Sequence, residues 1–252
     1  MNSHCIVDEN LSYAWGRVFL LALKEGEILP LVVTVTGFSG GHPKEDAVIR
    51  QMLDDELLAN SKRSCRTVAS TIFPEALWTP GAPRDELYER YAKILPGLKR
   101  IPANRNGLYF ERMISHGPTQ VNQLEHSIGT WTRGNRRRSA LYAAIVDPSR
   151  DHTHQRQRGF PCLQQVAFTP QHSTGTLAIT GFYNTQYLFE RAYGNYLGLC
   201  GLGRFMAQEF GLTLSRMTCI AAVAKQEMAR TRIESFAANL TRAVTVEQDD
   251  NA

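Results

Sequence analysis

The order of apolar and polar residues predicts that helices and strands alternate along the first half of the chain. Apolar residues recur at helical spacing after Asn10 and Ser12, which predicts a capped helix that ends at Gly26. A continuous apolar run at 29–36 predicts a buried strand before the glycine-rich segment 37–41, which we expect to be a plain loop. Further helices are predicted over 43–58, 85–95 and 118–131, and further strands over 67–73 and 141–146.

The second half of the chain predicts a β-hairpin followed by a long buried helix. Apolar runs of strand length at 163–168 and 177–183 flank the turn-like segment 169–175. From Gln186 the period becomes helical, and Gly211 ends the pattern. The apolar stripe of this helix consists of Leu188, Ala192, Tyr196, Leu199, Leu202, Met206 and Phe210.

Length and composition predict a single α/β (α+β) domain over 1–252, with a central mixed sheet flanked by helices. Of the 252 residues, 43% are hydrophobic and 21% are charged, as is ordinary for a soluble globular protein. A last helix is predicted over 222–240, and a flexible acidic tail over 241–252.

The charge and the apolar runs indicate where such a protein works. No apolar run approaches the length of a membrane span, and the N-terminus lacks the basic and then apolar layout of a secretory signal. We therefore expect a cytoplasmic protein that does not bind a membrane. The net charge of +4 is modest, so nucleic acid is not the expected partner unless basic residues cluster locally.

Cysteine is the residue type that we expect to carry the chemistry. The chain has five cysteines, an odd number without a Cys-x-x-Cys pair, which indicates free thiols rather than a zinc site. His152 and His154 have no third ligand at suitable spacing, so no metal site is expected. Cys162 follows Pro161 at the start of the predicted hairpin, and arginines just before it are expected to lower the pKa of its thiol. Taken alone, a free cysteine more often only packs in a core.

The combination of Pro161-Cys162, the hairpin and an asparagine ahead of a long apolar helix resembles folate-dependent thymidylate synthase. In that family a Pro-Pro-Cys-His loop carries the nucleophile. An asparagine that reads the uracil edge stands eleven positions after the arginine of an Arg-Ser-x-Asp turn. Here Asn184-Thr185-Gln186-Tyr187 takes the position of that turn, and Asn195 stands eleven positions after Asn184. The resemblance implies Cys162 as the nucleophile and Asn195, Asn184 and Thr185 as substrate-binding residues.

Further segments resemble the same family. The segment 75–78, Glu-Ala-Leu-Trp, is similar to a Glu-Leu-Leu-Trp segment whose Glu arranges water and protons around the pyrimidine. Tyr109 lies in a segment that resembles Gly-x-x-Tyr-Gly-x-x-Trp-Arg. Arg138 stands sixteen positions after Asn122, which begins an Asn-Gln-Leu similar to the family's Asp-Gln-Leu. The resemblance implies catalytic roles for Glu75 and Tyr109, and implies that Arg138 crosses a dimer interface to the partner's nucleotide phosphate.

The resemblance implies a homodimeric transferase that acts on a pyrimidine nucleotide or a related heterocycle. A thiolate that attacks ring carbon 6 makes carbon 5 nucleophilic. An amide such as that of Asn195 donates to oxygen 4 while it accepts from nitrogen 3, whereas a carboxylate only accepts. The product carries a methyl or hydroxymethyl group at carbon 5, and the implied one-carbon donor is 5,10-methylenetetrahydrofolate.

The chain departs from the family pattern at positions that hold phosphate, sugar and folate. Leu163 follows the nucleophile where the family has histidine, and Asn184 and Ser139 stand where it has arginine. The residues after 240 are expected to be too few for the segment that closes over the folate. These departures favour, as an alternative, a catalytically inactive homologue that binds nucleotides or acts as a scaffold. RNA binding through the arginine cluster 133–138 is a third hypothesis.

Overall fold

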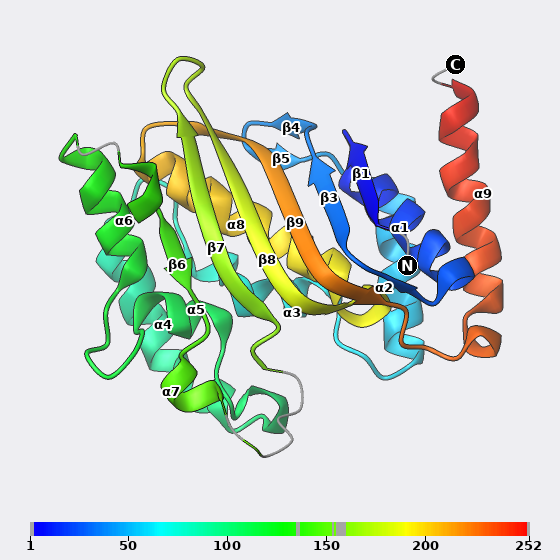
Figure 1. Cartoon of the computed structure of the whole chain (residues 1–252), viewed down its shortest axis with the longest axis horizontal. Helices are drawn as coiled ribbons and strands as arrows, with labels where there is room; N and C mark the ends of the chain where they lie inside the picture. The colour runs from blue at the N-terminus through cyan, green and yellow to red at the C-terminus, as the bar shows by residue number, and fades with distance from the viewer. Residues whose placement is uncertain (1–2, 135–136, 153, 155–159, 251–252) are drawn as a thin grey trace.

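The fold is a mixed β-sheet with helices packed against one of its faces (Figure 1). The structure is a computed structural model that describes residues 3–134, 137–152, 154 and 160–250, with side chains described up to 245. It confirms the predicted α/β class with a central mixed sheet. The strands of this sheet are β1 (His4–Asp8), β2 (Glu27–Ile28), β3 (Leu31–Val35), β6 (Tyr142–Ala144), β7 (Leu163–Gln171), β8 (Thr176–Tyr187) and β9 (Thr213–Lys225). A separate small hairpin joins β4 (Phe38–Ser39) and β5 (His42–Pro43).

The longest strand, β9, lies in the middle of the sheet. The order of the strands is β1-β3-β9-β8-β7-β6, and β2 also pairs with β9. β9 runs parallel to β8 and antiparallel to β3. The prediction of a helix over 222–240 was therefore wrong up to residue 233: β9 continues to Lys225, which pairs with Tyr187 of β8, and α9 begins only at Glu234. Alanine-rich sequence favours a helix locally, but insertion between two strands outweighs that preference.

The helices account for most of the remaining chain. They are α1 (Leu11–Glu25), α2 (Ala47–Ala59), α3 (Cys65–Ile72), α4 (Arg84–Lys99), α5 (Tyr109–Ile114), α6 (Gln123–Thr132), α7 (Pro148–Asp151), α8 (Tyr193–Glu209) and α9 (Glu234–Asp250). Single turns are η1 (Glu75–Leu77), η2 (Pro102–Asn104), η3 (Arg138–Ala140), the π-helical η4 (Leu188–Ala192) and η5 (Arg230–Arg232). As predicted, the Asn10 side chain accepts from the Ser12 amide, and Gly26 ends α1 with a φ of 82°. None of the helices in the described ranges has the length and apolarity that crossing a membrane requires.

The segment 67–73 is helical, although its β-branched residues predicted a strand. Ser64 caps α3 by accepting a hydrogen bond from the Thr67 amide. Cys65, Val68 and Ile72 follow one face and are buried. The cap and the packing of this face outweigh the strand preference of the single residues. α3 lies against α8, and Figure 1 shows both behind the sheet.

The hairpin and the long helix after it form as predicted. β7 and β8 pair antiparallel, and all seven residues of the predicted apolar stripe are buried. The helix begins at Leu188 with the π-helical turn η4, which continues directly into α8. Gly194 allows α3 to approach closely, because a Cβ at that position would lie 2.7 Å from the carbonyl oxygen of Cys65. Gly211 has a φ of 69° and ends the helix.

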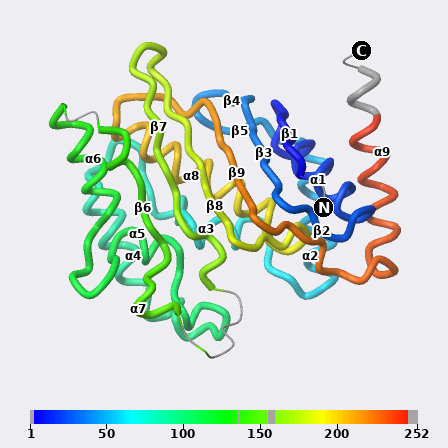
Figure 2. Tube along the Cα trace, viewed as in Figure 1, coloured from blue at the N-terminus to red at the C-terminus, as the bar shows by residue number. Residues whose placement is uncertain are grey.

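The C-terminal residues continue as the helix α9. Figure 2 shows α9 beside α1 at one end of the sheet. Phe236 is buried, and its ring lies 5.7 Å from the ring of Phe19. α9 extends to Asp250, so the backbone from residue 241 to residue 250 is helical, and the flexibility expected of this segment stays a prediction. Burial of Phe236, Leu240 and Val244 stabilises α9, which continues beyond residue 240, where the predicted helix ended.

Candidate functional site

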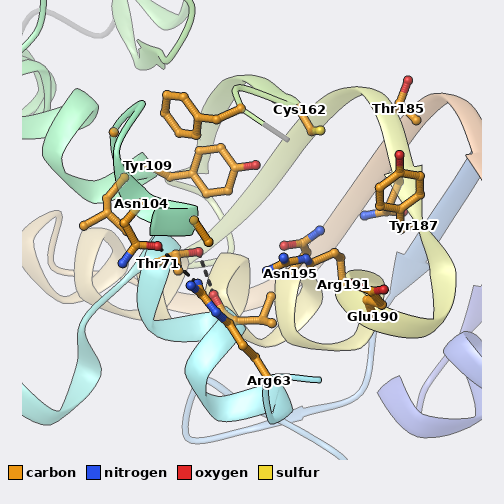
Figure 3. A pocket seen from close by; sticks show the side chains of 16 residues that line it. Arg63, Thr71, Asn104, Tyr109, Cys162, Thr185, Tyr187, Glu190, Arg191 and Asn195 are labelled. Atoms are coloured by element: carbon orange, nitrogen blue, oxygen red, sulfur yellow. Dashed lines mark hydrogen bonds between the residues drawn. The ribbon is translucent and has the colours of Figure 1, made fainter. Parts of the chain in front are cut away.

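A pocket of about 110 Å³ lies where α3, the start of α5, the end of β8 and the start of α8 meet. Figure 3 shows the side chains that line it. The polar ones used below are Arg63, Tyr109, Cys162, Thr185, Glu190, Arg191 and Asn195. Segments far apart in the sequence therefore supply one cavity. It brings together four of the seven residues that the resemblance selected, namely Cys162, Tyr109, Asn195 and Thr185.

Cys162 is half-buried at the wall of the pocket, just before β7. Its carbonyl oxygen accepts a hydrogen bond of 3.0 Å from the Asn184 amide, which fixes the loop against β8. Burial raises the pKa of the Cys162 thiol, and the positive charge of Arg191 opposes this effect. The arginines that we expected to lower this pKa, Arg156 and Arg158, lie outside the described residues. The net direction is upward, so the thiol is mainly protonated at neutral pH.

Asn195 faces the same pocket from the first turn of α8. Its side chain is only 5% exposed, and the structure gives it no hydrogen-bond partner among the described residues. Its amide nitrogen and oxygen are not among the fully buried polar atoms without a partner, so they are open to the pocket, where an amide can both donate and accept a hydrogen bond. Figure 3 shows the amide between Cys162 and Arg191. This placement agrees with the expected role in reading the edge of a heterocycle.

Tyr109 begins α5, and its ring stacks on Phe160 with the ring centres 5.2 Å apart. Burial raises the pKa of the Tyr109 phenol. The hydroxyl group therefore stays protonated at neutral pH and acts as a hydrogen-bond donor. It stands beside Cys162, as the resemblance implied.

Asn184 does not face the pocket, although its neighbour Thr185 does. The Asn184 side chain is exposed, whereas Thr185 is half-buried and lines the cavity. The pocket is lined by the last three residues of β8, 185–187, and Asn184 lies just before the part of the strand that reaches it. The Asn184 side chain is therefore not part of this pocket, and its binding role stays a prediction; its backbone amide supports Cys162.

Glu75 also lies away from Cys162. Its carboxylate forms an ion pair with Arg204 of α8 in a separate groove, and it does not line the pocket. The Arg204 guanidinium in turn lies over the ring of Trp78, 5.0 Å from its centre. The resemblance to a motif predicted that Glu75 would lie in the active site. In the structure, Glu75 lies on the turn η1 and lines a different groove, beside Arg204 of α8. The catalytic role expected for Glu75 is therefore not supported.

Arg138 is exposed on the turn η3 and does not line the pocket of its own chain. Its expected contact with a bound phosphate therefore requires a second copy of the chain.

Two arginines that we did not select converge in the pocket. Arg63 precedes α3, and its Nη1 donates to Asn104 Oδ1 over 3.1 Å. Burial and the nearby charge of Arg191 both lower the pKa of Arg63. Glu190 lines the pocket but forms an ion pair with Lys62. Within the described ranges, neither Arg63 nor Arg191 has an acidic partner.

A sequence pattern could have identified Arg191 as a site residue, but none identified Arg63. Arg191 stands four residues before Asn195, and this spacing places both on one face of a helix. Arg63 follows Ser61 and Lys62 in what the sequence shows only as a polar loop. Two like charges held near each other, with the one pocket carboxylate, Glu190, paired to Lys62, are suited to an anionic group.

The pocket is small for the implied cofactor. Its volume of about 110 Å³ is below the roughly 300 Å³ at which pockets for drug-sized ligands begin. It holds a single ring, with the rest of a ligand directed toward the open side. The described residues also contain no cluster of three side chains suited to a metal ion.

Comparison with known proteins gives no family for the chain. No protein-family model matches it, and no curated protein matches it significantly. The function is therefore inferred from the sequence and the geometry of the pocket.

Proposed function

We propose that the chain is a thymidylate synthase-like transferase that binds a pyrimidine nucleotide, or a related anionic heterocycle, beside Cys162. The observation that supports this most strongly is the convergence of a thiol, an amide that faces the cavity, and two arginines without acidic partners among the described residues of one pocket. The thiol can attack a ring carbon, the amide can bind a ring edge that has a donor and an acceptor, and the arginines can bind a phosphate.

The chemistry begins with addition of the Cys162 sulfur to ring carbon 6. The thiol proton passes to water, the sulfur–carbon bond forms, and the ring double bond shifts its electrons toward oxygen 4. The Asn195 amide donates to this oxygen as negative charge develops there. Arg191 favours the thiolate, and the Tyr109 hydroxyl provides a further donor beside the sulfur.

Carbon 5 then reacts with a one-carbon donor at the oxidation level of formaldehyde. The new carbon–carbon bond forms, and the proton on carbon 5 passes to water. The bond between the transferred carbon and its donor then breaks, water adds to that carbon, and the sulfur is expelled from carbon 6 as the ring double bond is restored. This sequence gives a hydroxymethyl product, whereas a methyl product needs a hydride from a reductant as well. Methylenetetrahydrofolate remains a candidate donor only if the pocket opens further than in this structure.

The second candidate is a catalytically inactive homologue that binds nucleotides. The position of Glu75 outside the pocket and the raised pKa of Cys162 favour it, because both remove reactivity while the binding groups stay in place. Both candidates predict the same ligand and differ only in the covalent step.

The transferase is proposed to act in the cytoplasm as a homodimer. Figure 1 shows that no helix crosses the face of β7, β8 and β9 opposite α8. Phe182 and Tyr142 project from this face with 41% and 44% of their surface exposed. A second copy that covers this face would bury them and bring a second Arg138 into the assembly.

Mass spectrometry after incubation with 5-fluoro-dUMP distinguishes the candidates. The fluorine cannot leave carbon 5 as a proton does, so an enzyme of this kind retains an adduct on Cys162. We expect an adduct that Cys162→Ala abolishes and that Cys5→Ala, which changes an exposed cysteine, leaves intact. Incubation with and without methylenetetrahydrofolate tests the donor. Ligand binding without any adduct supports the inactive homologue, and no binding of any pyrimidine contradicts both.

A further inference from the structure

The first turn of the helix that carries Arg191 and Asn195 is held by a residue distant in the sequence. Neither η4 nor α8 has a side-chain cap from its own N-cap residue. Instead, one carboxylate oxygen of Glu227 accepts from the Glu190 amide over 2.6 Å, and the other accepts from the Phe189 amide over 3.4 Å. The amides at the start of a helix have no partner within it, so this carboxylate satisfies two of them.

The other contacts of this turn do not involve its first backbone amides. Trp15 Nε1 donates to the Leu188 carbonyl oxygen over 2.8 Å, which holds the turn from its other side. The Lys62–Glu190 ion pair holds a side chain and not the backbone amides. Negative charge at a helix N-terminus is favourable in addition to the hydrogen bonds. Among these contacts, Glu227 is the one that accepts hydrogen bonds from backbone amides of the first turn.

We propose that Glu227 is a positioning residue: its carboxylate fixes the start of the η4–α8 helix and thereby holds Arg191 and Asn195 in the pocket. Arg191 stands one residue after the capped amide of Glu190, and Asn195 stands one turn further on. The positioning role rests on the proposed function only for the identity of the ligand that these two groups bind. Their placement beside Cys162 is tested without any substrate.

The pH at which Cys162 becomes reactive reports the position of Arg191. The guanidinium charge opposes the effect of burial on the pKa of this thiol, so a displaced arginine lets the pKa rise. The phenols of Tyr109 and Tyr183 also interact with the thiol, and the charged groups Arg63 and Glu190 line the same pocket. Removal of the negative charge of Glu227 would by itself lower the pKa of a nearby thiol. A rise in Glu227→Ala therefore distinguishes a displaced Arg191 from a simple change of charge.

The experiment measures alkylation of Cys162 by iodoacetamide against pH, with peptide-resolved mass spectrometry to separate the five cysteines. We expect Arg191→Gln to raise the midpoint by about one pH unit, which is about a tenfold loss of rate at neutral pH. Glu227→Ala is expected to raise it by roughly half a unit, about threefold in rate. In the Arg191→Gln background, Glu227→Ala should add no further shift.

Two further variants keep the test decisive. Glu227→Gln retains the size of the side chain and one acceptor oxygen, so we expect a smaller rise in the alkylation midpoint. If Glu227→Ala does not fold, Glu227→Gln is measured in its place. Glu89→Ala removes an exposed carboxylate of α4 and should leave the midpoint unchanged. A folded Glu227 variant with the wild-type midpoint would overturn the proposal, and so would a shift that persists without Arg191. Neither result depends on whether a pyrimidine binds.

Discussion

The reactivity of Cys162 depends on two opposing effects, which are burial and the charge of Arg191. Burial acts on the thiol whether or not a ligand is present, whereas the charge of Arg191 is shared with any anion that binds beside it. A phosphate bound at Arg63 and Arg191 would therefore partly cancel the stabilisation of the thiolate. This coupling makes the arginines central to both the binding and the chemistry of the pocket.

The first prediction concerns the thiol itself. In the native protein, we expect the pH midpoint of Cys162 alkylation to lie above the ordinary value of about 9, because burial raises the pKa of the thiol. In urea the midpoint should fall to that ordinary value, since burial is lost. The midpoint, unlike the absolute rate, does not depend on access to the sulfur. A native midpoint below the unfolded one would show that the charge of Arg191 outweighs burial.

The second prediction concerns the two arginines. Arg63→Gln and Arg191→Gln should each weaken binding of a pyrimidine nucleoside monophosphate by roughly tenfold to a hundredfold, because a hydrogen bond to a charged group is worth about 1.5–3 kcal/mol. The affinity for the corresponding nucleoside, measured by the same calorimetric titration, should change little. Arg66→Gln serves as the control, because Arg66 is exposed on α3 and does not line this pocket. Equal losses for nucleotide and nucleoside would contradict the phosphate assignment.

The packing of α3 on α8 sets the width of the pocket. Both helices contribute residues to its wall, and glycines of α8 let the backbones approach closely. A Cβ at Gly194 would lie 2.6 Å from the Cβ of Val68, which is closer than real side chains come. Val68 and Asn195 both line the pocket, so this contact positions two of its walls.

The third prediction follows from this contact. Gly194→Ala should lower the free energy of unfolding by about 1–3 kcal/mol, because an added methyl group in a tight contact forces the helices apart. Gly97→Ala is the matched control: Gly97 is exposed in α4, and a Cβ there meets nothing within 4 Å. Alanine at that helical position should stabilise by roughly 0.5–1 kcal/mol. Urea unfolding measures both, and a Gly194 variant as stable as the control would show that α3 shifts at little cost.

The sheet presents one face to helices and the other face to the surroundings. Val32, Ile220 and Phe182 form a row across β3, β9 and β8 on this other face, and none of them is buried. Apolar residues side by side on an open sheet face are typical of an interface. They support the proposal that two copies associate through this face.

The fourth prediction tests that association. The wild-type protein should sediment as a dimer, and Phe182→Asp should sediment as a monomer, because a buried carboxylate without a partner destabilises an interface. Val48→Asp on α2 is the control, since Val48 is 68% exposed and lies outside this face. Sedimentation velocity at several concentrations measures the association. A monomeric wild type, or equal dissociation of both variants, would contradict the proposed dimer.

Much of the fold followed from local patterns. The helical spacing after Asn10, the paired runs around 169–175 and the stripe from Leu188 to Phe210 each predicted an element that the structure contains. Cys162, Tyr109, Thr185 and Asn195 do meet in one pocket. These predictions succeeded because the periodicity of buried residues depends on the element to which they belong and not on distant neighbours.

What the order of residues could not decide depends on partners far along the chain. β9 is a strand because β3 and β8 flank it, and 67–73 is helical because α8 covers one side of it. Glu75 turns toward Arg204, and Asn184 faces outward, through contacts that no local pattern encodes. Arg63 becomes part of the pocket only when its loop meets the start of α8, more than a hundred residues later. Burial and charge are properties of the assembled chain, so these features follow from its packing alone.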